Sequence, residues 1–488
     1  MTAHTSELLP AARRSPQRSG LTMMLAALAH SLRSTVQRPP GTDLIRPVAH
    51  VSCVIPAYNE EDSIRSVLEA LLTQTRPPQT IHVIANNVSD DTVWEAEKLA
   101  GFYRSRHKNT LYETQVVVHD IGNNADKKVG ALNYGWDIAK AEGAKYILGV
   151  DGDTTLHKKC LEYLLEEMEG DTRIGGLSAI YSFDPPTSRS PVRQFLVAAQ
   201  KAQFADFNMD NLLRNRNMAV LGGQASLFRA EALQTAATRY HQSHPWTTDS
   251  EVEDSLLSLQ IRDAGYLTKI SSRARASVGA METLRSLYAQ QVKWTTGGIE
   301  LMKHRPFHPN LRLRWKETTS MVFNILCRLL FVVLLVTSLS IGAFMFHPVW
   351  LIPPVAAWLL AVRVTWSMKN RTVWDWLYSA LLLPAEMYMW LRATYFISSW
   401  WQVLTKVERD NWGAQASAES GRGGSGMLWP LVVITVIGGV IAYSWQQLTA
   451  EQQAGVISMG WPILMVITIA LTIGMLTKVL RRHRGFRV

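Results

Sequence analysis

The chain has 488 residues, 47% of them hydrophobic and 18% charged, and its formal net charge is +10. This length allows two or three domains. The apolar residues are unevenly spread: the first two thirds of the chain are mixed, whereas the last third contains long apolar runs with few charges. Basic residues lie beside those runs rather than in one patch, which favours anionic lipid headgroups and a phosphate-bearing substrate over nucleic acid.

The three cysteines, Cys53, Cys160 and Cys327, are far apart in the sequence. Their spacing matches no metal site, and their odd number suggests no disulfide framework. We therefore place the soluble part of the chain in a reducing cytosol.

The N-terminal segment, residues 1–48, is expected to lie outside the folded domain. Its first 20 residues are polar and contain prolines and arginines, which indicates disorder. Apolar residues then recur at helical spacing between Leu21 and Leu32, in a run too short to span a bilayer. The basic residues around this run favour an amphipathic helix on the cytosolic leaflet. An ordinary packing helix fits the same pattern equally well.

Residues 49–300 are predicted to form an α/β domain. Runs of strand length alternate with helical segments, and this alternation indicates a parallel sheet with right-handed crossovers. No Gly-x-Gly-x-x-Gly sequence follows the first run, so the dinucleotide-binding fingerprint is missing. The predicted strands are Val51–Pro56, Ile81–Ala85, Val116–Val118 and Tyr146–Val150.

Two carboxylates, Asp151 and Asp153, follow the fourth predicted strand with one glycine between them. The carboxyl end of a parallel strand faces the crevice in which α/β proteins bind ligands. Carboxylates this close repel each other unless a positive charge lies between them, and Mg²⁺ or Mn²⁺ suits that position. A pair of this kind taken alone is more often a solvated turn. Lys128, just before a predicted helix, is a candidate for phosphate binding, and a solvated lysine fits its position equally well.

Five ordered motifs within residues 50–300 resemble the inverting family 2 glycosyltransferases. The last two are similar to the Thr-Glu-Asp and Gln-x-x-Arg-Trp motifs of the processive membrane branch. That branch includes cellulose, chitin, hyaluronan and poly-N-acetylglucosamine synthases, and the last of these is the most similar. The motifs are Pro56–Glu61, Lys128–Asn133, Val150–Asp153, Val252–Asp254 and Glu282–Gly298.

The resemblance implies a GT-A type, Rossmann-like domain followed by a transmembrane helical bundle, and it implies roles for individual residues. Asp254 would be the catalytic base, Trp294 would stack under the acceptor sugar, and Mg²⁺ or Mn²⁺ would be the cofactor. Without the family, the carboxylates before Asp254 would be interpreted as an acidic helix start. The matching positions are Asp254 and Glu253 for catalysis; Ala57, Tyr58, Glu60, Asn86, Lys128, Asp151 and Lys293 for the nucleotide sugar; Gly223, Gln224, Gln290 and Trp294 for the acceptor; and Asp151 and Asp153 for the metal.

The chain departs from the family pattern at two places. The family usually has an aspartate at the end of the second strand to hold uracil or ribose, and here Asn86 or Asn87 is nearest. An asparagine amide can still hydrogen-bond the uracil, but it both donates and accepts, whereas an aspartate carboxylate only accepts. Lys293 replaces the usual arginine, which keeps the charge and loses the bidentate fork.

The last third is predicted to enter the membrane. Four apolar runs can span a bilayer. Three are uncharged, and the second contains only Arg363, which we expect to snorkel toward the cytosolic side. The basic residues between the runs predict that the enzyme domain and the C-terminus are in the cytosol. The aromatic-rich segment 373–404, within the interface region 301–412, is expected to be interfacial or re-entrant, with a helical hairpin as the alternative. Residues 413–426 are expected to form a flexible linker before the C-terminal segment 427–488. The four runs are 329–346, 348–366, 427–445 and 456–477.

The resemblance implies an inverting, processive enzyme that polymerises a β-linked polysaccharide from a UDP-sugar, and the apolar runs predict a multi-pass protein of the inner cell membrane. UDP-N-acetylglucosamine is the first choice of donor and UDP-glucose the second. The expected partners are the donor, the growing polysaccharide, membrane lipids and, in addition, accessory membrane or export subunits, but no nucleic acid. Two alternatives stay open: transfer of one sugar to a lipid such as polyprenyl phosphate, and a non-catalytic nucleotide-sugar-binding subunit. The Gln-x-x-Lys-Trp helix argues against the first alternative, because transfer of one sugar to a lipid phosphate needs no extended acceptor platform. The presence of Asp151, Asp153 and Asp254 argues against the second, because a non-catalytic protein would be expected to lose some of them.

Overall fold

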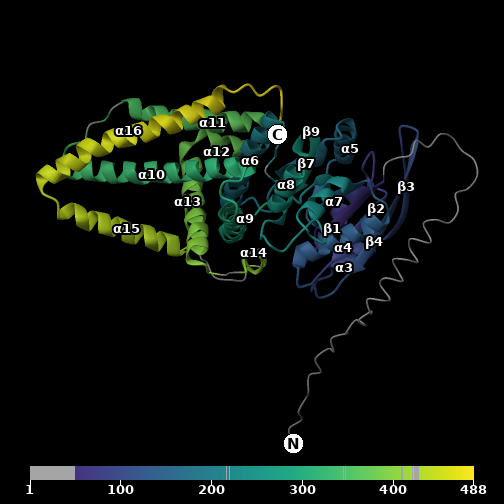
Figure 1. Cartoon of the computed structure of the whole chain (residues 1–488). Coiled ribbons are helices and arrows are strands. Elements are labelled where there is room, and N and C mark those ends of the chain that lie inside the picture. The colour runs from purple at the N-terminus through teal and green to yellow at the C-terminus, as the bar shows by residue number, and fades with distance from the viewer. Residues whose placement is uncertain are drawn as a thin grey trace, which may run out of the picture.

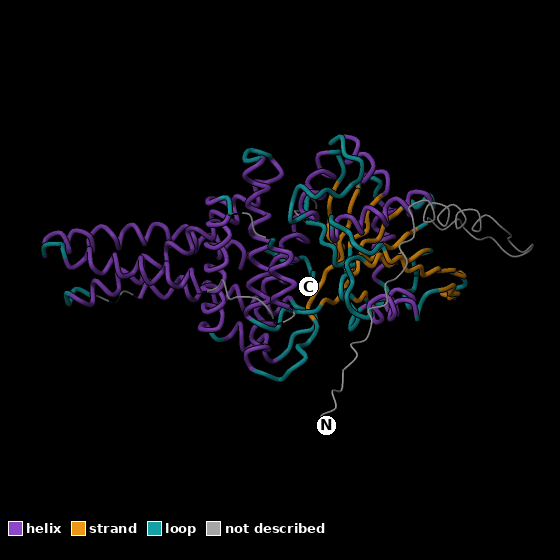
Figure 2. Tube along the Cα trace, turned by 90° about the horizontal axis from the view of Figure 1, so that it is seen from below, coloured by secondary structure: helices purple, strands orange, loops and turns teal. Residues whose placement is uncertain are grey.

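The computed structural model describes residues 50–488 except 216, 219, 345, 347, 408–409, 420 and 422–427. The helix expected within residues 1–48 therefore lies outside the described residues. The described chain has two parts, a sheet-containing body at one end and a group of long helices at the other (Figures 1 and 2).

The centre of the sheet is parallel, as the sequence predicts. Its strands lie in the order β4-β2-β1-β5, and β1 pairs in parallel with both β2 and β5. All seven residues of β1 are buried, as expected for a strand covered by helices on both faces. The four bounds are β1 (Val51–Ala57), β2 (Thr80–Ala85), β4 (Thr110–Asp120) and β5 (Tyr146–Gly149).

The outer strands make the nine-stranded sheet mixed. The sequence pattern did not predict the hairpin of β3 and β4, because β3 alternates between exposed and half-buried residues and carries polar side chains. On the other side, β8 runs antiparallel to β5 and β7, whereas β9 is parallel to β7. The remaining strands are β3 (Gly101–His107), β6 (Thr155–Leu156), β7 (Ile174–Phe183), β8 (Ser226–Arg229) and β9 (Leu267–Val278).

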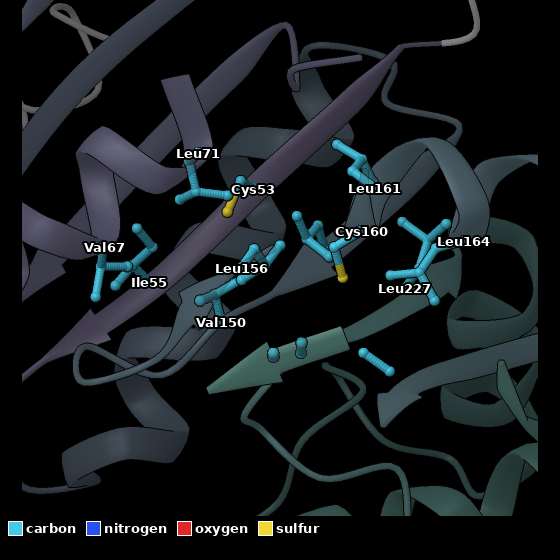
Figure 3. Close-up of a cluster of buried hydrophobic side chains, with 14 of the residues drawn as sticks. Cys53, Ile55, Val67, Leu71, Val150, Leu156, Cys160, Leu161, Leu164 and Leu227 are labelled. Atoms are coloured by element: carbon cyan, nitrogen blue, oxygen red, sulfur yellow. The ribbon is translucent and has the colours of Figure 1, made fainter. Parts of the chain in front are cut away.

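Helices cover both faces of the sheet, and alternate residues of β1 point into two separate cores. Cys53 and Ile55 pack in one core with residues of α2 and α5 (Figure 3). Val54 points the other way, into a core shared with α4 and α6 to α8. The helices of this body are α2 (Ile64–Leu72), α3 (Thr92–Glu97), α4 (Lys127–Ala141), α5 (Cys160–Gly170), α6 (Pro191–Arg214), α7 (Ala230–Arg239), α8 (Glu253–Asp263) and α9 (Leu284–His304).

Among the described residues, three helical segments are long and apolar enough to cross a membrane: Pro309–Ser340, Pro348–Ser367 and Ala450–Leu480. They contain α10 (Arg312–Ser340), α11 (Ile352–Ser367) and α16 (Ala450–Leu480). The first helix ends earlier than the predicted run, because a turn with Gly342 at φ +68° follows it. The run predicted at 427–445 coincides with α15 (Leu428–Gln446), some of whose side chains lie outside the described set.

The segment 373–404 forms α12 (Val373–Ala380) and α13 (Leu382–Thr405). These helices pack against the sheet-containing body: Lys201 of α6 forms a 2.5 Å ion pair with Asp375 of α12. Tyr288 of α9 hydrogen-bonds Ser398 of α13. The segment therefore lies at the junction between the two parts of the chain.

The expected flexible linker is wrong for its first half. Residues Asn411–Glu419 form helix α14, which packs on α9. Asp410 begins this helix, because its carboxylate accepts a hydrogen bond from the Gly413 amide at 2.9 Å. A short segment rich in glycine, alanine and serine has the composition of a flexible linker, and its composition does not show that it packs against another helix.

We expect Gly135→Ala to destabilise the protein by about 1–3 kcal/mol, because a Cβ on α4 would lie 2.3 Å from Val54 Cγ1 of β1. Thermal unfolding in detergent checks this value. Gly170→Ala is the matched control, since a Cβ there meets nothing within 4 Å. Equal melting temperatures for both variants would contradict the tight packing of α4 on β1.

Candidate active site

A cleft of about 1710 Å³ opens at the carboxyl ends of β1, β2 and β5. It continues past α8 and α9 to side chains of α10 and α13, and α14 lies at its rim. Of the fourteen residues predicted for the site, all but Ala57 and Gly223 line this cleft. Ala57 and Gly223 contribute backbone groups instead: the Ala57 carbonyl accepts from Asn86, and the Gly223 amide donates to Asp254.

Three carboxylates converge where β1 and β5 end. Burial and the charge of Asp151 raise the pKa of Asp153 to about 6. Burial and the charge of Asp153 raise the pKa of Glu60 to about 8. Gly152 allows this approach, because a Cβ there would lie 2.8 Å from Glu60 Cγ. The site therefore concentrates more negative charge than its own cations neutralise.

Lys128, in the first turn of α4, provides positive charge inside the cleft. Its Nζ atom lies 2.7 Å from Asp151 and 3.5 Å from Glu253. Burial alone would lower its pKa, but the charges of Asp151, Asp254 and Glu253 raise that pKa well above its usual value. Lys128 thus stays charged and links the strand-end carboxylates to those of α8.

Asp254, in the first turn of α8, has the environment of a general base. Its Oδ2 atom accepts a 2.8 Å hydrogen bond from the Gly223 amide. Burial and the charge of Glu253 raise its pKa to about 7, although the charge of Lys128 acts in the opposite direction. A base with a pKa near the working pH combines the ionised state with a strong proton affinity.

Gly223 separates the two groups of carboxylates. A Cβ at this position would lie 2.6 Å from Asp151 Oδ1 and 2.7 Å from Lys128 Nζ. Only a glycine lets the backbone approach both groups so closely while its amide holds Asp254. The predicted small-residue loop therefore lies between the predicted metal-binding carboxylates and the predicted base.

Helix α9 carries Gln290, Lys293 and Trp294 along the cleft. Trp294 packs edge-on against Phe204 of α6, with ring centroids 5.9 Å apart. Gln290 Oε1 and Gln291 Nε2 are buried and have no hydrogen-bond partner in the described part of the chain. Such groups suit a hydroxyl-rich ligand. Gln291 was not predicted, and its place in the Gln-Gln pair is the signal that could have indicated it.

Lys293 is 5% exposed, and burial lowers its pKa to about 8. Its Nζ atom lies 3.3 Å from the ring centroid of Trp412, a residue of α14 that the sequence did not indicate. An ion pair of 3.0 Å between Lys127 and Asp410 and a 2.7 Å hydrogen bond between Asn411 and Glu251 fix α14 at the rim. The helix mistaken for a linker is therefore part of the site wall.

The two asparagines at the end of β2 join neighbouring loops. The Asn87 side chain donates to the Asn124 carbonyl at 2.8 Å and accepts from the Asn124 amide at 2.9 Å. Asn86, 2% exposed, donates to the Ala57 carbonyl at 3.0 Å. An aspartate at position 87 could not donate to the Asn124 carbonyl, so the departure from the family pattern supports this loop contact.

Asp151 and Asp153 can supply part of a site for a divalent cation. Within the described ranges, no group of three or more His, Cys, Asp or Glu side chains could hold a metal ion by itself. Asp151 and Asp153 supply two carboxylates, and the raised pKa of Asp153 indicates negative charge without sufficient compensation. Mg²⁺ is usually held by one or two carboxylates plus substrate phosphates. The residues fit a cation that a bound diphosphate helps to coordinate.

Residues 52–236 match the model of Glycosyl transferase family 2, and residues 146–388 match that of Glycosyl transferase family group 2. The two matches overlap and together include the strand-end carboxylates, α8 and α9. The chain belongs to glycosyltransferase family 2 and is an enzyme of that family.

Curated relatives are similar over part of their length. Poly-beta-1,6-N-acetyl-D-glucosamine synthase of Staphylococcus epidermidis is 25% identical over 301 residues, which cover 59% of this chain and 66% of the relative. The enzyme of that name in Staphylococcus aureus is 24% identical over 275 residues, covering 56% and 60%. The alignments thus span less than two thirds of each relative. A solved mannosyltransferase from Pyrobaculum calidifontis, in complex with GDP-Man and Mn²⁺, shares 16% identity at a TM-score of 0.42, covering 79% of this chain and 97% of that one.

We expect Asp254→Asn to lower the rate of nucleotide release by about 10²–10⁴, because an amide cannot accept the acceptor proton. Initial rates with saturating donor and an unchanged melting temperature establish this effect. Asp249→Asn is the matched control, since Asp249 belongs to the same acidic tract but does not line the cleft. Loss of rate in the control, or retention in Asp254→Asn, would remove Asp254 from the base position.

We expect a bell-shaped pH profile. Activity should rise as Asp254 loses its proton near pH 7 and fall as Lys293 loses its charge near pH 8. In Lys293→Arg the falling limb should disappear, because a guanidinium stays charged throughout this range. Initial rates from pH 5 to 10, in buffers of constant ionic strength, provide the measurement. A falling limb unchanged in Lys293→Arg would assign it to another group.

Proposed function

We propose that this enzyme is an inverting, processive glycosyltransferase that polymerises a β-linked polysaccharide from a UDP-sugar and moves it through the membrane. UDP-N-acetylglucosamine is the proposed donor. One observation carries the proposal: a single cleft joins the strand-end carboxylates, Asp254 and Trp294 to side chains of α10 and α13. A polymerase needs room for a product beyond its acceptor sugar, and the extension of the cleft to α10 and α13 supports such a path. The similarity to poly-beta-1,6-N-acetyl-D-glucosamine synthases supports the choice of donor.

The chain's own residues supply both sides of the reaction. Asp254 takes the proton from the acceptor hydroxyl, which then attacks the anomeric carbon opposite the departing diphosphate and inverts its configuration. Lys128 and Lys293 offer ammonium groups to the diphosphate. Mg²⁺ or Mn²⁺ held by Asp151 and Asp153 would, when bound, stabilise the negative charge of the leaving diphosphate. Tyr58, Glu60 and Asn86 line the same cleft, and we assign them to the nucleotide.

The acceptor side offers an apolar platform and unpartnered amides. A sugar ring can rest its C–H face on the indole of Trp294 without losing all water from its hydroxyls. Gln290 Oε1 and Gln224 Oε1 are buried and lack partners among the described residues, so both can accept hydrogen bonds from sugar hydroxyls. These groups suit a sugar chain with many hydroxyls, and none of them carries the positive charge that would bind a lipid phosphate.

We place the enzyme in the inner cell membrane as a multi-pass protein. The three candidate spans support membrane association, and the basic residues after α11 and α16 support a cytosolic catalytic domain and C-terminus. In this arrangement 49–300 is the catalytic domain, 301–412 holds the interface helices and the first membrane helices, and 427–488 holds the last membrane helices. Accessory membrane subunits can join this assembly.

The test uses full-length protein in lipid vesicles with Mg²⁺ or Mn²⁺ and radiolabelled UDP-sugars. We expect high-molecular-weight product from UDP-N-acetylglucosamine, retained at the origin of a gel and absent with Asp254→Asn. A product of one sugar that extracts into organic solvent would replace polymerisation by transfer to a lipid acceptor. Nucleotide-sugar binding without nucleotide release from any donor would favour a non-catalytic subunit.

A further inference from the structure

A basic corner lies between the end of α11 and the residues that follow α16. The Val488 amide donates to the Ser367 carbonyl at 2.9 Å, and the Lys369 amide donates to the Val488 carbonyl at 2.6 Å. Val488 is 6% exposed and packs in the core next to Met368. The last residues of the chain therefore run beside the segment that leaves α11, at the junction of the helical part and the sheet-containing body (Figure 1).

Two guanidinium groups meet in this corner. Arg487 Nη1 donates to the Trp366 carbonyl at 2.6 Å, and Arg371 Nη1 donates to the same oxygen at 3.0 Å. A third arginine, Arg275 of β9, donates to the Arg487 carbonyl at 2.8 Å. Because one oxygen accepts from both Arg371 and Arg487, two like charges are held side by side. Such a pair is unfavourable unless an anion lies against it.

No acidic side chain in the described part of the chain forms an ion pair with these two guanidinium groups. Asp206 and Asp210 of α6 pair instead with Lys478 of α16 and with Arg481 just after it, and Asp375 of α12 pairs with Lys201. Arg371 and Arg487 form no ion pair with any described residue, and the hydrogen bonds shown for them use Nη1 and backbone carbonyls. Their remaining N–H groups are free to bind an anion. Exposed Lys369 follows directly after the Ser367–Met368 turn and adds a further positive charge.

The corner lies at the end of two candidate membrane spans. Trp366, in the last turn of α11, is 56% exposed, and the Arg371 guanidinium lies over its ring at 5.2 Å and over Trp376 at 5.7 Å. Tryptophan at the end of a span marks the headgroup level of a bilayer, where phosphate groups are densest. Arginine binds phosphate with two parallel N–H groups, and its stacking on an indole fixes the direction of that fork.

We propose that Arg371 and Arg487, with Lys369 beside them, form a binding site for the phosphate group of an anionic lipid. The proposal depends on the membrane placement given above but not on the donor or the product. The chemistry recognised is a phosphate mono- or diester, which a lipid headgroup or a soluble phosphate compound can supply. The exposed Trp366 and the adjoining spans favour the lipid.

The test measures binding of short-chain phosphatidylglycerol, phosphatidylcholine and inorganic phosphate to the full-length protein in detergent, by isothermal titration calorimetry. We expect phosphatidylglycerol to bind at least about tenfold more tightly than phosphatidylcholine. Arg371→Gln with Arg487→Gln should weaken that binding by about fivefold for each cation removed. Arg371→Lys with Arg487→Lys keeps the charge and loses the fork, so it should give an intermediate affinity.

The matched control removes two charges from a distant surface. Arg104 and Arg106 are exposed on β3, at the sheet edge away from α11 (Figure 1), and their replacement by glutamine should leave lipid binding unchanged. Equal affinity for the two lipids, or unchanged phosphatidylglycerol binding in the Arg371 and Arg487 glutamine variant, would overturn the proposal. Inorganic phosphate binding as tightly as the lipid would overturn the lipid assignment and support a soluble phosphate ligand. None of these readouts needs glycosyl transfer, so they stand apart from the polymerisation assay.

Discussion

The contact on which the candidate site depends is that of Lys128 with the carboxylates around it. Its Nζ atom touches Asp151 at 2.7 Å and lies 3.5 Å from Glu253, so one ammonium joins the end of β5 to the start of α8. Without that charge, the buried carboxylates would repel each other and favour protonation. Lys128 can be there because α4 packs closely on β1 through Gly135. The electrostatics of the site thus follow from the packing of one helix on one strand.

Helix α6 connects the long helix α16 to Trp294, the residue proposed to stack under the acceptor sugar. One face carries Asp206 and Asp210, which pair with Lys478 and Arg481 at the end of α16. Another face carries Phe204, whose ring packs edge-on against Trp294. Because a helix is stiff over this length, the position of α16 and the wall of the cleft are mechanically linked. The same end of α16 leads into the segment that contains Arg487.

Asp254, the proposed base, and the cation Lys293 illustrate how burial changes the pKa values of side chains in this cleft. Burial moves the pKa of the carboxylate up to about 7 and that of the ammonium down to about 8, and in both cases it does so by disfavouring the charged form. The two ionised forms therefore coexist over a narrow range of pH. Trp412 covers the Lys293 ammonium and restricts its position, so α14 contributes to the wall of the candidate site.

The sequence by itself determined the parallel strands β1, β2, β4 and β5, the long apolar helices and the family, because these depend on local periodicity and on short motifs with fixed spacing. It also placed the Asp151–Asp153 pair at a strand end. Only the tertiary structure decided that residues 411–419 form a helix over Lys293, that Asn87 joins two loops, and that Arg371 and Arg487 share one carbonyl. These features are contacts between residues far apart in the chain. Such contacts depend on packing and charge between residues that only the folded chain brings together, and a local sequence pattern does not contain that information.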